Sequence, residues 1–262
     1  MRLLRRILVT VALTFAAIFV GVYWVAPIAL SFYAASKALP VARIVPTELN
    51  DHSVSLAPGT KLSYLGYEFE VPWNDLDESK TERYPKNKPD KSMAVLTFRS
   101  GLRLRLTSAP PRVFGNQFAA DFKVPPQKLE AIFGHGSASS DYVFVKSVYT
   151  FTPDKMHFWS LSTGLHYRED MLLMIKSIMP AKAAETGIFY VQNEDYKGFQ
   201  QGDPRTRPEH MEVDLYSDDG GVEFNFALKD YHDPAGLTQP EINRIVQSLH
   251  RAPPSEVAVS AR

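Results

Sequence analysis

Residues 211–228, with the sequence MEVDLYSDDGGVEFNFAL, decide how the second half of this chain folds. Residues 211–216 and 222–228 contain alternating apolar and polar positions with β-branched and aromatic side chains, a pattern that favours two strands. Residues 218–221 (DDGG) separate them and have the composition of a tight turn. The stretch therefore predicts an antiparallel β-hairpin.

A second hairpin and a helix flank this hairpin. Residues 187–192 and 196–201 are strand-like and enclose residues 193–195 (NED), so they predict another hairpin. Further along, Thr238 and Glu241 have the spacing of a capping box, which marks the start of a helix. The buried stripe of this helix is expected to consist of Ile242, Ile245, Val246 and Leu249.

Strand signals also occur in the first half of the chain. Residues 61–73 alternate apolar and polar side chains and predict a half-buried strand that ends at a proline. Residues 92–98 and 102–107 flank an Arg-Ser-Gly turn and predict a further hairpin. Its second strand would turn Arg103 and Arg105 to one face, either as an anion-binding stripe or as an ordinary polar sheet face.

The remaining segments predict one more strand, helices and a loop. Residues 74–91 are charged and rich in proline, as in a loop. Residues 125–133 begin with proline and end before glycine, as in a short helix. Residues 142–151 have the composition of a strand, and residues 153–184 follow a helical rhythm. The chain is therefore expected to be α+β, with an antiparallel β-sheet domain and flanking helices.

The composition excludes several classes of function. The 262 residues include 29 Lys+Arg and 29 Asp+Glu, and the resulting net charge of zero argues against nucleic acid as a partner. The absence of cysteine excludes disulfides, thiolate nucleophiles and cysteine zinc sites. The sequence contains no phosphate-binding glycine loop and no dinucleotide fingerprint, so no cofactor is predicted.

The N-terminal segment predicts a membrane anchor. Residues 7–27 carry no charge and are long enough to cross a hydrocarbon core as a transmembrane helix. Arg2, Arg5 and Arg6 precede this segment, so the positive-inside rule places the N-terminus in the cytoplasm. The alternative is a signal peptide cleaved after Ala38, but the apolar run is longer than in such peptides.

These signals divide the chain into five parts. They are a cytoplasmic N-terminus (1–6), a transmembrane signal-anchor (7–27), a tether (28–60), an extracytoplasmic α+β domain (61–252) and a disordered tail (253–262). The chain lacks Asn-x-Ser/Thr sequons, so nothing in it points to a eukaryotic secretory route. We therefore expect a single-pass protein of the bacterial inner (plasma) membrane with a periplasmic domain.

Two stretches resemble the PsbP-like family. Residues 66–73 (GYEFEVPW) are similar to its early strand, which runs into proline and tryptophan, and residues 187–249 are similar to its two hairpins and closing helix. The resemblance covers about a third of the chain, and residues 153–184 depart from it as an insertion. It implies an α/β sandwich, in which helices cover both faces of an antiparallel sheet, and a binding or assembly protein rather than an enzyme. It transfers no functional residue.

One group of side chains is a candidate for catalysis. Asp230, His232 and Asp233 follow the end of a predicted strand. An imidazole oriented by a carboxylate is half of a catalytic relay. No nucleophile motif such as Gly-x-Ser-x-Gly accompanies it, so the relay is incomplete in the sequence.

A second group is a candidate for metal binding. His166, Glu169 and Asp170 share one face of a predicted helix, and imidazole with carboxylates can hold a metal ion. Arg168 lies beside them, which is more typical of an ion-paired surface.

The sequence as a whole predicts a membrane-anchored, extracytoplasmic binding or assembly module of the cell envelope. Residues 7–27 would contact the membrane, and an envelope protein would be the partner. One alternative is a metal- or His/Asp-dependent hydrolase that uses the residues named above. Another is a small-molecule or lipid carrier, which would need a large apolar cavity.

Overall fold

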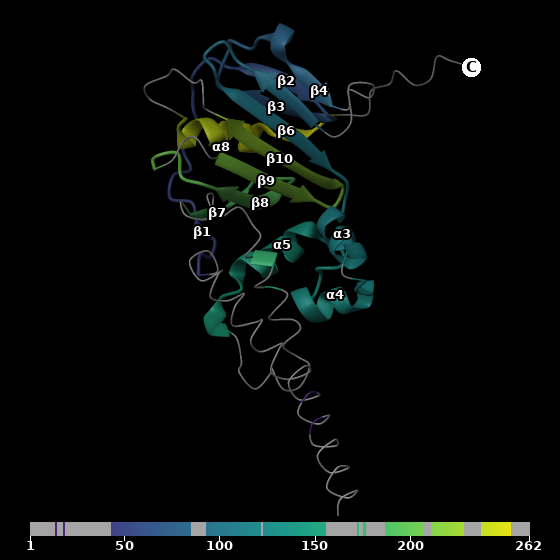
Figure 1. Cartoon of the computed structure of the whole chain (residues 1–262). Coiled ribbons are helices and arrows are strands. Elements are labelled where there is room, and N and C mark those ends of the chain that lie inside the picture. The colour runs from purple at the N-terminus through teal and green to yellow at the C-terminus, as the bar shows by residue number, and fades with distance from the viewer. Residues whose placement is uncertain are drawn as a thin grey trace, which may run out of the picture.

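The computed structural model shows an α+β protein with two sheets and several helices (Figure 1). The structure describes residues 43–84, 93–121, 123–155, 187–206, 211–227 and 237–252, together with Thr14, Ile18, Leu172, Ile175 and Lys176.

The larger sheet has eight strands in the order β1-β7-β8-β9-β10-β6-β5-β4. The strands are β1 (Thr47–Glu48), β4 (Glu82–Tyr84), β5 (Met93–Thr97), β6 (Arg103–Ala109), β7 (Ile188–Gln192), β8 (Lys197–Gln201), β9 (Met211–Ser217) and β10 (Gly220–Ala227). The pairs β5–β6, β7–β8 and β9–β10 confirm the three predicted hairpins. The sheet is mixed rather than fully antiparallel, because β1 runs parallel to β7.

The smaller sheet has the order β11-β3-β2, formed by β2 (Thr60–Tyr64), β3 (Tyr67–Val71) and β11 (His250–Arg251). The single strand predicted over residues 61–73 is therefore a hairpin. Its two turn residues, Leu65 and Gly66, have φ angles of 56° and 80°, as a type I′ turn requires. Leucine seldom adopts this conformation, so composition did not reveal the turn.

The first face of the large sheet is covered by the small sheet and by α8 (Gln239–Ser248). Phe69 of β3 meets Phe224 of β10 edge to face, with ring centroids 5.3 Å apart. The predicted capping box is present, because the Glu241 carboxylate accepts hydrogen bonds from the backbone N–H of Thr238 at 2.8 Å and from its hydroxyl at 2.9 Å. The predicted apolar stripe of α8 is buried in this core.

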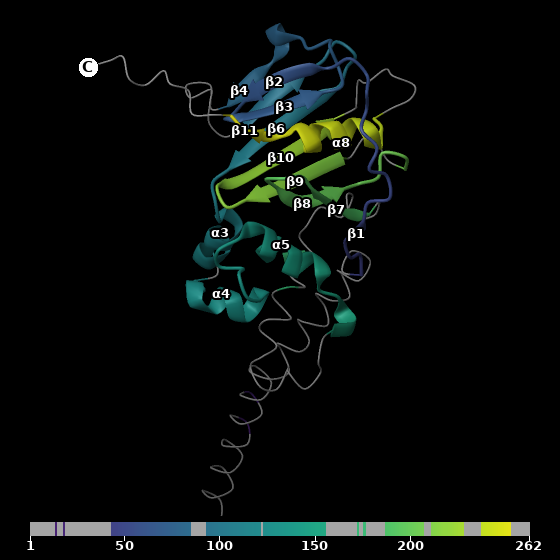
Figure 2. The ribbon, with the colours of Figure 1, turned by 180° about the vertical axis from the view of Figure 1, so that it is seen from behind.

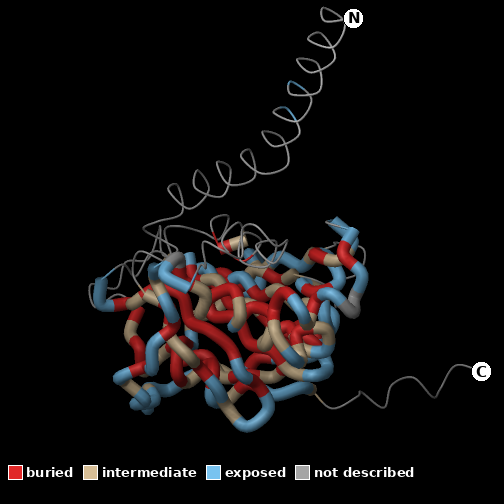
Figure 3. Tube along the Cα trace, turned by 90° about the horizontal axis from the view of Figure 1, so that it is seen from below, coloured by how far each residue is buried: buried red, intermediate tan, exposed pale blue. Residues whose placement is uncertain are grey.

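The second face is covered by α3 (Val113–Asp121), α4 (Pro126–Phe133) and α5 (Asp141–Thr150). In both views these helices gather beside β8 and β9, at the end of the molecule away from β2 and β4 (Figure 1, Figure 2). Helix α4 confirms the prediction for residues 125–133. Buried segments gather in the interior of the domain, and many of the exposed ones lie around its rim (Figure 3).

The strand predicted over residues 142–151 is wrong, because this stretch forms α5. Phe144, Val145, Val148 and Tyr149 are buried, and their spacing is that of a helical stripe. The Ser140 hydroxyl also accepts a hydrogen bond from the N–H of Val143, as at a helix start. Packing of this stripe against the sheet outweighs the strand propensity of the β-branched and aromatic residues.

Two predicted non-helical segments contain short elements. The predicted loop 74–91 includes β4 and a 3-10 turn, Glu78–Lys80, and the predicted tether 28–60 includes β1. Helix α3 was not predicted.

Several predictions concern residues outside those that the structure describes. They are the disordered tail 253–262, most of the helical region 153–184 and, apart from Thr14 and Ile18, the anchor 7–27. Among the described residues, no helix is both long enough and apolar enough to cross a membrane.

Candidate functional site

The predicted site residues lie outside the part of the chain that the structure describes. They are the catalytic candidates Asp230, His232 and Asp233 and the metal candidates His166, Glu169 and Asp170. They stay predictions, and the site is built here from other residues.

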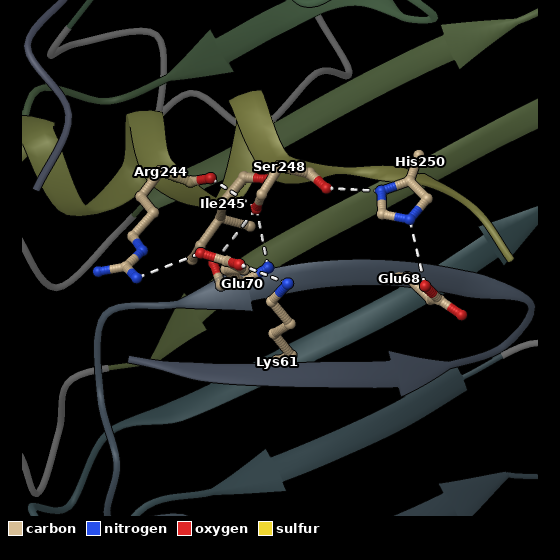
Figure 4. Close-up of polar contacts among 7 residues, drawn as sticks. All are labelled: Lys61, Glu68, Glu70, Arg244, Ile245, Ser248 and His250. Atoms are coloured by element: carbon tan, nitrogen blue, oxygen red, sulfur yellow. Dashed lines mark hydrogen bonds and ion pairs between the residues drawn. The ribbon is translucent and has the colours of Figure 1, made fainter. Parts of the chain in front are cut away.

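His250 lies on the outer side of the small sheet, just after α8 (Figure 4). Its Nε2 lies 3.2 Å from Oε2 of Glu68, and its Nδ1 lies 2.9 Å from the carbonyl oxygen of Ser248. The Ser248 hydroxyl donates instead to the carbonyl oxygen of Arg244, at 2.7 Å. Since the Ser248 hydroxyl is not a partner of the imidazole, these residues do not form a nucleophile–base relay.

The neighbouring charges in Figure 4 hold α8 against β3. The Glu70 carboxylate pairs with Arg244 at 3.2 Å and with Lys61 at 3.4 Å. The backbone N–H of Glu70 donates to the Ser248 hydroxyl at 2.8 Å. These groups satisfy one another, so their role is to fix the two elements together.

Three carboxylates meet on the second face of the large sheet. Glu212 and Asp214 lie on the same face of β9 because strand side chains alternate. Glu223 lies directly opposite Asp214 on β10. One carboxylate oxygen of each residue lies within 4.8 Å of the others. We call these three residues the carboxylate cluster.

Each member of the carboxylate cluster accepts a hydrogen bond from a side chain on a neighbouring position, and Glu212 also accepts a longer one, of 3.5 Å, from Gln201. The donors are Gln201 Nε2 to Asp214 at 3.1 Å, Asn225 Nδ2 to Glu212 at 3.0 Å and Arg105 to Glu223 at 2.5 Å. Only Arg105 carries a positive charge, so the cluster and its partners together keep an excess of negative charge when all three carboxyls are ionised.

Burial and mutual repulsion control the protonation of the carboxylate cluster. Burial, with the charges of Glu212 and Glu223, raises the pKa of Asp214 well above its ordinary value. Burial and the charge of Glu223 also raise the pKa of Glu212. Arg105 and the amide donors act in the opposite direction but do not cancel this effect. The cluster therefore retains protons at a pH at which exposed carboxyls are ionised.

The same oxygens define which ion the cluster could hold. Carboxylate oxygens without nitrogen or sulfur donors suit hard cations such as Ca²⁺ or Mg²⁺. Arg105 already neutralises Glu223, however, and the buried carboxyls are also satisfied by protons. Protons and a hard cation would therefore compete for the same oxygens.

The carboxylate cluster borders an uncovered part of the second face. Helices α3–α5 cover β7, β8 and β9, whereas the side chains of β5, β6 and β10 on this face are half-buried or exposed apart from the buried Thr97. Arg105 remains 44% exposed and Glu223 29% exposed despite their ion pair. We call this surface the open face; it consists of Met93, Val95, Arg103, Arg105, Thr107, Glu223 and Asn225.

The open face decides between the two interpretations of Arg103 and Arg105. Both side chains lie on one face, as predicted, but Arg105 is paired with Glu223. The surface is therefore a mixed polar sheet face rather than an uninterrupted anion-binding stripe.

Sequence reasoning missed the carboxylate cluster although its signal is present. Glu212 and Asp214 have the spacing of side chains on one face of a strand, and the register of the predicted hairpin brings Glu223 opposite Asp214. Flanking helices were expected, but the pattern of the strands did not indicate which polar positions the helices would cover.

Comparisons with known proteins give no assignment. No protein-family model, no curated protein and no solved structure matches this chain. The PsbP-like resemblance stays a prediction, and function is argued from the described residues.

Proposed function

We propose that this chain is a membrane-anchored, extracytoplasmic binding or assembly module of the cell envelope, which contacts a protein partner through its open face. The observation that carries the proposal is the incomplete helical layer. Helices α3–α5 leave the sheet face uncovered over the three neighbouring strands β5, β6 and β10. This surface presents positive and negative side chains, polar groups and the apolar side chains of Met93 and Val95. Mixed composition of this kind is typical of non-obligate protein interfaces.

The described polar groups favour binding over catalysis. His250 is held by Glu68 and the Ser248 carbonyl, and the carboxylate cluster has no nucleophile among its partners. The hydrolase alternative depends on His232 or His166, which lie outside the described residues. The carrier alternative needs a large apolar cavity, whereas the hollows lined by described residues have mainly polar side chains.

The anchor and its orientation are supported by the sequence alone. Residues 7–27 are uncharged and follow three arginines, so the domain would lie outside the cytoplasm. A reporter that is active only outside the cytoplasm, fused after Arg262, is expected to be active. Activity of a cytoplasm-specific reporter fused at the same position would refute the orientation.

The open face is tested by photo-crosslinking of the full-length chain in its membrane. A photoreactive amino acid at Val95 or Arg103 should give a discrete protein adduct, and the same amino acid at Leu56, which is 95% exposed on another surface, should not. Arg105→Glu in the Val95 variant removes the ion pair with Glu223 and should weaken the adduct. Equal adducts from Val95 and Leu56, or no effect of Arg105→Glu, would contradict the proposal.

A further inference from the structure

A hollow lies at the β1 edge of the large sheet, several strands away from the open face. It has a volume of about 660 Å³, which is within the range of small-ligand pockets. Four elements line it: β1 and the residues after it, β7 with its turn, α5 and α8. Both ribbon views place β1 and β7 between α8 and α5 (Figure 1, Figure 2). We call it the edge hollow.

The edge hollow exists because β1 is short. β1 has two residues and pairs with Phe189 and Tyr190. The next residues of β7, Val191 and Gln192, pair with β8 on one side but have no described strand on the β1 side. The Gln247 side chain of α8 donates to the Gln192 carbonyl at 3.0 Å instead. The floor of the hollow is therefore the edge of β7, where the carbonyl oxygen of Gln192 already accepts a hydrogen bond from Gln247.

The framework of the edge hollow is fixed by amide side chains. Asn193 Nδ2 donates to the carbonyl oxygens of Val246 and Leu249, at 2.7 and 2.9 Å. Asn243 Nδ2 donates to the carbonyl oxygens of Asp51 and Ser53, at 2.8 and 2.7 Å. Since these amides are occupied in holding the walls together, recognition falls to the other lining side chains.

One wall presents two aromatic rings beneath an ammonium group. The Lys146 Nζ lies 5.6 Å from the ring centroid of Tyr142 and 5.5 Å from that of Tyr190. Both rings pack on Phe199, and the Tyr142 ring is nearly parallel to it, at 18°. The rings are thus held in place from behind, and their other sides remain partly exposed.

A carboxylate lies near the same two rings. Burial raises the pKa of Tyr142 and of Tyr190, and the charge of Glu48, which also lines the hollow, adds to this rise. Glu48 and Lys146 nevertheless form no ion pair with each other, and among the described residues neither has another ion-pair partner. A positive and a negative group therefore stand near one aromatic surface without neutralising each other.

We propose that the edge hollow binds a small zwitterion, either a free aromatic amino acid or a short peptide ending in one. Its carboxylate would pair with Lys146, its ammonium with Glu48, and its ring would lie against Tyr142 and Tyr190. Charge complementarity selects this class: a plain anion would meet Glu48, and a plain cation would meet Lys146. The proposal is independent of the open face.

The test is isothermal titration of the purified full-length chain with phenylalanine and with the dipeptide Ala-Phe. Each is compared with its N-acetylated and its C-amidated form. Binding that N-acetylation and C-amidation each weaken about tenfold or more supports a zwitterion site. Binding of Phe identifies a free amino acid as the ligand, and binding of Ala-Phe alone identifies a peptide. Equal binding of a modified form, or dissociation constants above about 1 mM for both zwitterions, would overturn the proposal.

Two variants assign the charges. Lys146→Met keeps an unbranched stem against the rings and should weaken the better of the two zwitterions about tenfold, whereas Lys128→Met, which removes an exposed lysine from α4, should not. In the Glu48→Gln variant, N-acetylation of the ligand should weaken binding no further. The carboxylate of Glu48, which would pair with the ligand's ammonium, is already absent from this variant. A thermal unfolding curve for each variant separates loss of the site from loss of the fold.

Discussion

The two faces of the large sheet bury polar groups of different kinds. On the first face, Gln200 and Gln239 exchange hydrogen bonds of 2.7 and 2.8 Å, and Gln239 also donates to Asn243 at 2.9 Å. The second face holds ionisable groups: Asp141, Lys176 and Asp214 are buried there, and Glu212 is half-buried. Neutral amides do not titrate, so the amide network of the first face should add no pH dependence to the stability, whereas the ionisable groups of the second face should.

The largest expected effect tests the first face alone. Phe224 is fully buried against Phe69, so Phe224→Ala should lower the free energy of unfolding by about 3–5 kcal/mol. The loss should be the same at pH 5 and pH 8, because no charged group is involved. Leu56→Ala, at a side chain that is 95% exposed, is the matched control and should change stability by less than about 0.5 kcal/mol. A pH-dependent loss in Phe224→Ala would break the contrast between the faces.

The next effect concerns Lys176, whose ammonium donates to the carbonyl oxygens of Tyr149 and Phe151 at 2.9 and 2.6 Å. Burial lowers its pKa from 10.5 to about 8. Between these values the unfolded chain binds a proton that the folded chain has lost, so the free energy of unfolding rises with pH, by up to about 3 kcal/mol. Denaturant titrations from pH 7 to 9.5 should show this rise. Lys176→Met should lack it, and an equal slope in both proteins would contradict the prediction.

A smaller effect of opposite sign is expected at the carboxylate cluster. The raised pKa of Asp214 means that its contribution to stability is fully present below the unfolded pKa and is lost as pH rises through the folded pKa. Asp214→Asn keeps an acceptor for Gln201 and should therefore stabilise the fold at pH 8 by on the order of 1–3 kcal/mol, and less at pH 4. Asp218→Asn, at an exposed turn position, should do neither. A pH-independent shift in Asp214→Asn would sink the prediction.

The smallest effect returns to the first face. Thr238→Ala removes the hydroxyl that donates to Glu241 at the start of α8 and should cost about 1 kcal/mol. The loss should be equal at pH 6 and pH 8, measured by thermal unfolding. A loss confined to one pH would show that charge, rather than the capping contact, controls this end of α8.

The sequence predicted the elements that local patterns define. Three hairpins and α8 followed from alternation, turn composition and a capping box, which involve residues close in the chain. Helix α5 was misassigned because Val143, Val145 and Val148 favour strands in isolation, and the packing that overrides this preference is long-range. The same lack of long-range information hid the turn at Leu65, where the fold holds a leucine in a glycine-like conformation.

The candidate sites were less predictable than the fold. The carboxylate cluster joins β9 and β10 on a face whose burial depends on where α3–α5 end. The edge hollow joins four elements, and its charged side chains come from distant parts of the chain, with no motif to connect Glu48 with Lys146. Spacing along a chain cannot reveal groups that only tertiary packing brings together.

The two outermost strands of the large sheet are both very short: β1 has two residues and β4 has three. An unpaired strand offers a ladder of donors and acceptors onto which a neighbouring molecule can add its own strand. The large sheet therefore offers little ladder at either border, so edge-to-edge stacking should not grow from it even though it is broad. In the small sheet, the edge strand β2 has five residues and is the longer ladder.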